Sequence, residues 1–348
     1  MTDAVHIVGT GACHGDGRVA SAALDRVHGL PPGSVERLTG VRERRYARDL
    51  DQIDMAVRAA MLALDDAGLA PGDLDAVLHA AAVPYQSIPA TAPLVQRGLG
   101  TADGAVAAFD VNATCLGFLA AVQLAAAMVE GGRWRRALVA CSEVASRGLD
   151  WSAPATAGLF GDGAGAAVIA RAAGNEARPP LRVLHAALET HPSAYAASAL
   201  VAGGTRLDHD RDADAFERHR RFVMDGRALF GVTRKRFGGF VAGFLARAGW
   251  SADDVDCVVP HQASPLALAH MARAMGVPVG GLVDICATHG NQISASLPIA
   301  LDAARAEGRA GGTVLMLGTA AGVTFGAAAL AVEAATMTRR AARATRCG

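Results

Sequence analysis

Short apolar runs and amphipathic segments alternate along most of the chain. Apolar runs of four to nine residues bounded by turn residues are typical of buried strands. The run at residues 109–129 begins with a strand pattern and continues with a helical one, and Cys115 lies at the change. Alternation of this kind predicts an α/β fold in which helices cover sheets. The predicted strands are 5–9, 75–83, 105–111, 136–142, 164–170, 257–260, 282–285, 312–318 and 325–332.

Two helices have clear sequence signals. The segment 264–276 places Pro265 in its first turn, where proline is tolerated. The segment 50–68 ends at Gly68, a common residue after the last turn. Its period predicts one buried face made of Ile53, Val57, Ala60, Met61 and Leu64.

Three pairs of segments repeat in the same order, about 175–180 residues apart. We therefore predict two similar halves, 1–172 and 173–335, packed about a pseudo-twofold axis and followed by a basic flexible tail, 336–348. In this register Cys115 and His289 are matching points that meet at the centre. The repeated pairs are 66–80 with 247–261, 109–115 with 283–289, and 137–142 with 313–318.

Composition narrows the class of protein. With 348 residues and 51% hydrophobic residues, the chain can build one large core or two fused cores. A net charge of zero and only 5% aromatic residues argue against a nucleic-acid partner. Six cysteines without a CxxC pair favour reduced thiols in a cytoplasmic enzyme. No signal peptide is recognisable, and no apolar segment is long enough to predict a membrane span.

Cys115 is the candidate nucleophile. At the start of a helix, unpaired N–H groups and the helix dipole would stabilise its thiolate and lower its pKa. A buried structural cysteine is the competing interpretation. Gly117 allows close approach of a ligand or another backbone segment and supports the first interpretation.

Polar residues at other strand ends complete a candidate site. His261 follows the strand ending at Pro260, and such positions tend to face clefts in α/β folds. Asn291 lies in a Gly-Asn turn, which is either ordinary turn chemistry or an amide aimed inward. For His289 we favour a packing role over a second polar group in the cleft. The glycine-rich segment 159–169 lacks the ending of a phosphate loop and predicts close backbone packing.

These residues and their surroundings resemble the 3-oxoacyl-[acyl-carrier-protein] synthase III family of the thiolase superfamily. The resemblance covers nearly the whole chain in family order. It implies a five-layered αβαβα sandwich of two duplicated halves, assembled as a homodimer. It is carried by TGVRERRYA, IPATAPLVQ, DVNATCLGF, FGDGAGAAV, PHQAS and HGNQISASLPIAL.

The resemblance also implies roles. Cys115 would accept an acyl group from coenzyme A or from the phosphopantetheine of an acyl carrier protein. The N–H groups of Cys115 and Ala321 would form the oxyanion hole, and His261 and Asn291 would stabilise the enolate of a malonyl-type thioester. Decarboxylative condensation would then give a 3-oxoacyl product. No metal or bound cofactor is implied, and candidate pocket residues are Ile88, Arg37, His289 and Gly322.

Several positions depart from the family pattern. Ser34 and Leu38 stand where housekeeping members carry a Trp and an Arg, Arg37 is displaced, and Pro154 replaces another Arg. These changes put a coenzyme A donor in doubt and favour a carrier-bound donor. Ile88 is neither the Phe nor the Glu that relatives use at the partner's acyl tunnel, which suggests a specialised member.

Other functions remain open at this point. Cys115 could pass its acyl group to an alcohol, an amine or a carrier without forming a carbon–carbon bond, although Asn291 favours condensation because such relatives often carry Asp there. A non-catalytic partner subunit would be expected to lack the nucleophile. A plain cysteine hydrolase leaves the repeat and FGDGAGAAV unexplained.

Overall fold

The computed structural model describes residues 4–275 and 281–333, so the predicted tail 336–348 lies outside the described residues. Strands and helices alternate as the hydrophobic pattern predicts. The strands are β1 Val5–His14, β2 Gly17–Ala20, β3 Glu43–Tyr46, β4 Ala76–His79, β5 Ala107–Asp110, β6 Arg136–Glu143, β7 Gly163–Arg171, β8 Leu181–Thr190, β9 Ser198–Ala199, β10 Val223–Met224, β11 Cys257–Pro260, β12 Thr313–Ala320 and β13 Thr324–Val332. The α-helices are α1 Ser21–Val27, α2 Ser34–Thr39, α3 Gln52–Ala67, α4 Ala92–Gly98, α5 Gly117–Glu130, α6 Pro154–Ala157, α7 Ala213–His219, α8 Gly226–Ala248, α9 Pro265–Met275, α10 Cys286–His289 and α11 Ser296–Ala306.

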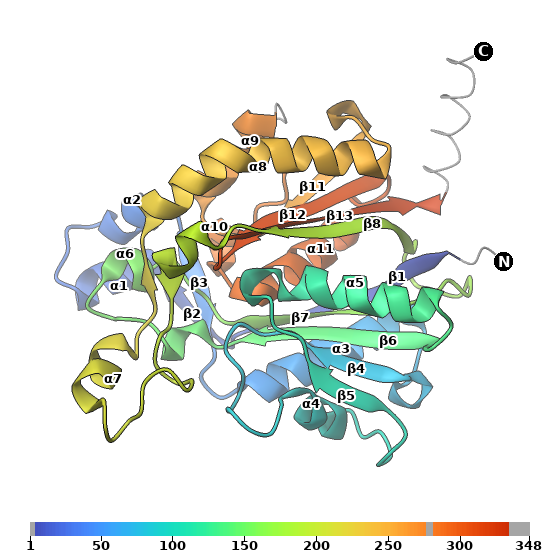
Figure 1. The fold of residues 1–348 in the computed structure, drawn as a ribbon, viewed down its shortest axis with the longest axis horizontal. Helices are drawn as coiled ribbons and strands as arrows, with labels where there is room; N and C mark the ends of the chain where they lie inside the picture. Colours follow the sequence, from blue (N-terminus) through green and yellow to red (C-terminus); the bar gives the residue numbers. More distant parts are fainter. Residues whose placement is uncertain (1–3, 276–280, 334–348) are drawn as a thin grey trace.

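Helices and strands form five stacked layers (Figure 1). Helices α3 and α4 cover one group of strands, α8 and α9 cover the other, and α5 and α11 lie between the two groups. Separate hydrophobic clusters fill the space under α3, the space around α5 and α11, and the space under α8. The helices of these layers therefore bury their apolar faces against the strands, and the predicted αβαβα sandwich is confirmed.

The two groups of strands have the same order. The first is β1-β7-β6-β4-β5 and the second is β8-β13-β12-β11, and β1 and β8 join them into one nine-stranded sheet. The place of a fifth strand in the second group is taken by a single parallel bridge between Leu282 and Val258. The prediction of a strand at 282–285 is therefore wrong: the Asp284 carboxylate accepts the N–H of Cys286 and starts α10 instead. The boundary between residues 172 and 173 stays a prediction.

Two of the predicted repeat pairs coincide with matching elements. Helices α3 and α8 end at Gly68 and Gly249, both in the left-handed conformation that glycine adopts readily. Each is followed by a short 3-10 helix and a parallel strand, β4 or β11. Strands β6 and β12 occupy the same place in their groups. The duplication seen in the sequence is thus present in the fold.

The third repeat pair was predicted in the wrong register. The structural counterpart of Cys115 is Ser294, not His289. Each follows a residue with positive φ, Thr114 at 51° or Ile293 at 52°, within a 3-10 turn that leads into a central helix. Short letter matches in an alanine-rich chain misled the alignment, whereas the shared turn is set by an asparagine two residues before Thr114 or Ile293.

Helix α3 packs closely on β1 because the residues on both contacting surfaces have small side chains. A Cβ atom at Gly9 would lie 2.2 Å from the carbonyl oxygen of Ala63. The buried face is therefore formed mainly by alanines with Met55 and Leu64, while Met61 is exposed. The predicted face was wrong at Met61. The hydrophobic pattern favours large apolar side chains, whereas the close approach of α3 to β1 admits only small ones there.

Strand β8 and helix α8 lie between residues 171 and 256, for which the hydrophobic pattern predicted no strand. A helical signal is nevertheless present. Residues spaced by three and four positions in the second half of α8 are buried against the sheet: Phe237, Phe240, Val241, Phe244 and Leu245.

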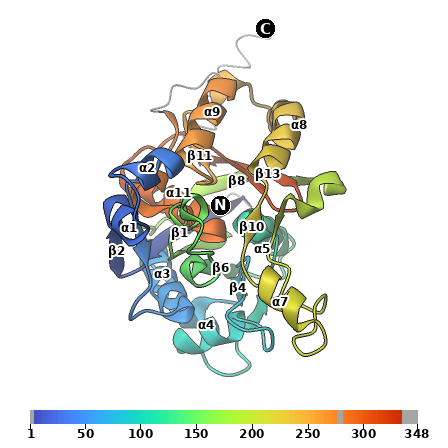
Figure 2. The ribbon, with the colours of Figure 1, turned by 90° about the vertical axis from the view of Figure 1, so that its left-hand side faces the viewer.

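The left-hand end of the molecule in Figure 1 is capped by short elements. Figure 2 looks onto this end and shows α1, α2 and β2 on one side and α7 on the other. The 3-10 turn of Cys115 precedes α5 at this end of the helix. Within residues 4–275 and 281–333, no helix has the length and apolar character needed to cross a membrane.

A buried charged cluster joins the two halves. The Asp66 carboxylate accepts hydrogen bonds from Arg178 and Arg305, and Arg178 also bonds Asp302. The Thr10 hydroxyl donates to Asp302. Burial alone would raise the pKa of Asp66, but the Arg178 hydrogen bond and the Arg305 charge outweigh it and lower the pKa. The carboxylate therefore stays ionised inside the protein and depends on its partners.

Replacing Arg305 by Met keeps most of the side-chain volume and removes one partner of Asp66. We expect the free energy of unfolding to fall by about 3 kcal/mol, because a buried carboxylate loses part of its compensation. Urea unfolding at a fixed protein concentration measures the change. The exposed Arg97→Met on α4 is the matched control and should change stability by less than about 0.5 kcal/mol. Equal stability of the two variants would contradict this role.

Candidate active site

Cys115 lies in a tight turn before the central helix α5. The side-chain oxygen of Asn112 accepts the N–H of Thr114 at 2.8 Å, which fixes the turn, and Thr114 has the positive φ that non-glycine residues rarely adopt. The N–H groups of Cys115 and Ala321 both act to lower the pKa of the Cys115 thiol, so both are directed at the sulfur. The predicted pair of oxyanion donors thus lies next to the sulfur atom.

The pKa of Cys115 differs from the prediction. Burial, and to a smaller extent the charge of the nearby Glu143 carboxylate, raise it to about 12. The two N–H groups lower it, but they do not offset the loss of solvation. The expectation of a lowered pKa was wrong because it counted the helix start and could not count the burial or the charge from a distant strand.

His261 follows the end of β11 in a crowded position. A Cβ atom at Gly318 of β12 would lie 2.5 Å from the Cβ of His261, so only glycine leaves room there. The Gln262 amide bonds the carbonyl of Val283 and the N–H of Ile285, which ties the strand end to the segment before α10. Burial lowers the pKa of His261 to about 4, so its ring is neutral at physiological pH.

Asn291 is placed by backbone contact with the glycine-rich segment. Its N–H donates to the carbonyl of Leu159, and its carbonyl accepts the N–H of Gly161 at 3.0 Å. A Cβ atom at Gly161 would lie 2.0 Å from the carbonyl oxygen of His289. The prediction of close backbone packing in this segment is confirmed. The Asn291 amide Nδ2 donates to the carbonyl of Ala263, two residues after His261.

A chain of contacts brings the three candidates to one place. The Leu116 side chain, next to Cys115, and the His261 side chain both border Gly318. Asn291 contacts the loop that continues from His261, and Ala321 directs its N–H at Cys115. The nucleophile comes from the first half of the chain and the polar groups opposite come from the second.

The other candidates have contacts of their own. The Arg37 guanidinium bonds Pro32 and Ser34 beside its own helix, and Ile88 is 87% exposed. His289 stacks on the ring of His14 at 4.3 Å between centroids, which supports packing. Gly322 has a φ of 133°, a conformation that other residues rarely adopt, directly after Ala321.

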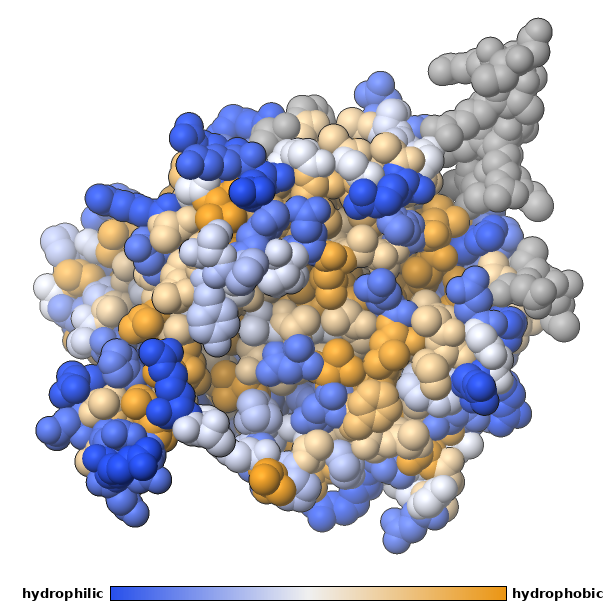
Figure 3. Space-filling model, in the orientation of Figure 1, coloured by the Kyte–Doolittle hydropathy of each residue, from blue (hydrophilic) through white to orange (hydrophobic). Residues whose placement is uncertain are grey.

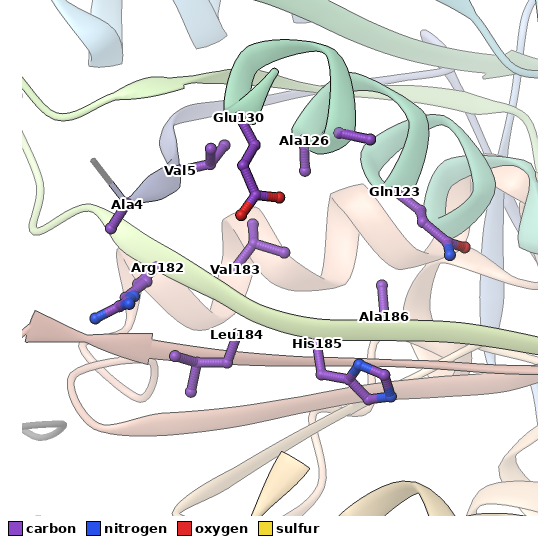
Figure 4. A pocket seen from close by; sticks show the side chains of 11 residues that line it. Ala4, Val5, Gln123, Ala126, Glu130, Arg182, Val183, Leu184, His185 and Ala186 are labelled. Carbon is purple, nitrogen blue, oxygen red and sulfur yellow. The ribbon is translucent and has the colours of Figure 1, made fainter. Parts of the chain in front are cut away.

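A groove of about 670 Å³ lies away from Cys115 (Figure 4). It is formed between the second half of α5 and the start of β8, whereas Cys115 precedes the first turn of α5. Gln123 and Glu130 line it from α5, and Arg182 and His185 line it from β8. The groove therefore contains none of the three candidate residues.

Known proteins are similar to this chain over most of its length. The family models for 3-oxoacyl-[acyl-carrier-protein] synthase III and its C-terminal part match residues 109–192 and 245–332. The beta-ketoacyl-[acyl-carrier-protein] synthase III 3 of Streptomyces coelicolor is 37% identical over 95% of this chain and 98% of its own. The chain belongs to the 3-oxoacyl-[acyl-carrier-protein] synthase III family.

Two further comparisons agree with membership of the synthase III family. A synthase III of Bordetella petrii is 40% identical over 84% of this chain and 85% of its own. The crystal structure of synthase III, FabH, from Pseudomonas aeruginosa superposes with a TM-score of 0.82 at 32% identity, covering 94% of this chain and 98% of that one. The suspected family, inferred from the sequence motifs, is thereby confirmed.

Sequence reasoning missed one polar residue beside the synthase III nucleophile. Glu143 ends the otherwise apolar strand β6, is 1% exposed, and accepts the Ser294 hydroxyl and the Ala82 N–H, both at 2.6 Å. The signal was present in the sequence. A lone acidic residue at the end of an apolar strand is the same kind of position that identified His261.

The raised pKa makes a prediction for the reactivity of Cys115. Since the thiolate fraction rises tenfold per pH unit below the pKa, alkylation by iodoacetamide should rise about tenfold between pH 8 and 9 without levelling off. Intact mass against time measures the rate of alkylation. The difference between the wild type and Cys115→Ser gives the part of that rate that belongs to Cys115. A plateau below about pH 8 would show an activated thiolate and refute the effect of burial.

Proposed function

We propose that this synthase III family member takes an acyl group from a thioester onto Cys115 and condenses it with a malonyl-type thioester. The product is a 3-oxoacyl thioester, and carbon dioxide is released. The observation that carries the proposal is a partly buried cysteine with two N–H groups directed at its sulfur, and His261 and Asn291 close by. The relatives named above are themselves 3-oxoacyl synthases.

In the first step the Cys115 sulfur attacks the donor carbonyl and the donor thiol leaves with the proton. The N–H groups of Cys115 and Ala321 would hold the negative oxygen of the tetrahedral intermediate. They are fixed by the backbone, so they need no reorganisation when that charge forms. Because the free thiol has a raised pKa, these donors must act mainly on the intermediate and not on a stored thiolate.

In the second step the malonyl-type thioester loses its carboxylate as carbon dioxide, and the electron pair forms an enolate. His261 and Asn291 would donate hydrogen bonds to the enolate oxygen. Burial keeps His261 neutral, so it can donate without adding a charge to the site. The enolate carbon then attacks the acyl carbonyl, the new carbon–carbon bond forms, and Cys115 leaves as the thiolate.

The substrates of such a reaction arrive as thioesters of coenzyme A or of the phosphopantetheine arm of an acyl carrier protein, and both carry phosphate. Helix α8 offers exposed cations, Arg227, Arg234, Lys235 and Arg236, and contains no acidic residue. A positive helix surface attracts phosphate and acidic partners. We infer a carrier-protein donor because Leu38 and Pro154 stand where housekeeping members of the family carry arginines. We infer a cytoplasmic setting from the free cysteines.

We also infer a homodimer. Strand β5 is an edge strand of the sheet, and Phe109 on it is exposed. An uncovered edge strand presents unpaired backbone groups that a second copy can pair. In Figure 3 apolar residues spread across the face on which α5 lies in front. Ile88 projects from the loop before α4, where a partner's acyl site could receive it.

The first test of this function is covalent acylation. Incubation with acyl-coenzyme A and acyl-carrier donors should add one acyl group to the wild-type protein and none to Cys115→Ala, as read by intact mass. Addition of a malonyl carrier should then discharge the adduct as a 3-oxoacyl product with carbon dioxide. Absence of any adduct on the wild type would refute the proposal. Discharge onto an alcohol or amine without carbon dioxide would favour acyl transfer.

Asn291→Ala separates the two steps. The variant should still accept the acyl group, whereas decarboxylation and condensation should fall about 10²-fold because one donor to the enolate is lost. Single-turnover acylation and release of labelled carbon dioxide measure the two steps. Gly72→Ala, at an open position of the chain, is the control for a harmless substitution. An equal loss in both steps would refute the assigned role.

A further inference from the structure

Glu143 is a buried carboxyl that the proposed reaction does not use. Its Oε1 atom accepts the Ala82 N–H and the Ser294 hydroxyl, both at 2.6 Å. The N–H groups of Val83 and Ser294 also stabilise its charge. One carboxyl group thereby joins three segments that are far apart in the sequence: the end of β6, the loop after β4, and the turn that follows Asn291.

The position of Ser294 explains why a carboxyl can lie here. Ser294 is the counterpart of Cys115 in the second half, so the two residues occupy equivalent turns at the centre of the molecule. The Ser294 hydroxyl lies 2.6 Å from Glu143 and 2.9 Å from the carbonyl oxygen of Ala80. The single hydroxyl proton can serve only one acceptor at a time. When Glu143 is ionised, it accepts the hydrogen bond from the Ser294 hydroxyl. When Glu143 is protonated, it can donate a hydrogen bond to the Ser294 oxygen, and the Ser294 hydroxyl can then donate to the carbonyl of Ala80.

We propose that Glu143 is a positioning residue of this enzyme: it holds the loop after β4 and the turn of Asn291 in place, and its charge tunes the nucleophile Cys115. The proposal rests on the function proposed above. Burial raises the pKa of Glu143 to about 7, although the Ser294 and backbone donors lower it. The turn of Cys115 packs against the turn of Ser294, so the carboxyl that Ser294 contacts lies near the thiol. The carboxyl changes its charge near neutral pH, and its charged form raises the pKa of Cys115.

Few other ionisable groups face this carboxyl among the residues that the structure describes. The Cys141 thiol lies on the same strand, and its pKa is raised by burial and then by Glu143. His79 on β4 is directed at the Ser142 hydroxyl, and burial lowers its pKa to about 4, so it stays neutral near pH 7. Of these three groups, Glu143 is therefore the one whose charge changes near neutral pH beside Cys115.

The test is the pH profile of Cys115 alkylation between about pH 6 and 9, which needs no acyl substrate. In the wild type the logarithm of the rate should rise with a slope below one around the Glu143 pKa, because ionisation of Glu143 makes the thiol a weaker acid. Glu143→Gln should have a slope of one throughout and react about three- to tenfold faster at pH 8. A Glu143→Gln profile that follows the wild type would overturn the proposal.

Ser294→Ala provides a second variant in case Glu143→Gln does not fold. It removes a donor to the charged carboxyl, so the inflection in the profile should move to higher pH. An inflection that stays in place would overturn the proposal.

The positioning role is tested with Glu143→Asp, which keeps the charge but shortens the reach to Ala82 and Ser294. It should keep the thiol profile and lose condensation at least about tenfold more than acylation. Equal losses of condensation and acylation in Glu143→Asp would contradict the positioning role. If no acyl adduct forms on Cys115 in the wild type, the proposed function fails while the alkylation profile still decides the effect of Glu143.

Discussion

The active site depends on a backbone contact between the two halves of the chain. The segment Leu159–Gly161 and the turn at Asn291 exchange hydrogen bonds, and no Cβ atom fits at Gly161 beside the His289 carbonyl. Backbone hydrogen bonds at such short range leave little freedom in either partner. The glycine-rich motif acts here through its backbone. It brings Asn291, from the second half, to the loop that carries His261.

Duplication gave the protein two equivalent turns at its centre, and they now have different tasks. In each, an asparagine side chain accepts the N–H two residues on, and the next residue precedes a central helix. The first turn presents the Cys115 thiol, whereas the second presents Ser294, which hydrogen-bonds a buried carboxyl. The second turn also carries Asn291, so its rigidity supports the proposed enolate site directly.

Buried charge has different surroundings at Asp66 and at Glu143. Asp66 is surrounded by Arg178 and Arg305, which keep it ionised and connect the halves. Glu143 has hydrogen-bond donors but, in the part of the chain that the structure describes, no cation among its contacts, so burial dominates and its pKa rises to about 7. The first arrangement suits stability. The second leaves a group that can gain or lose its charge next to the nucleophile.

The sequence by itself determined the alternation of strands and helices, the duplication, the family, and Cys115, His261 and Asn291 as candidates. These follow from local periodicity and from motifs, which short stretches of chain carry completely. Only the tertiary structure decided the register that pairs Cys115 with Ser294, the raised pKa of the thiol, and the place of Glu143. Each of these depends on burial, or on charges and backbone groups that fold together from distant segments. A local pattern can mark Glu143 as a carboxyl at a strand end, but it does not record the groups that surround it. Strand β8 and the bridge at Leu282 were also decided only by the tertiary structure, because a neighbouring strand determines whether a segment completes a sheet.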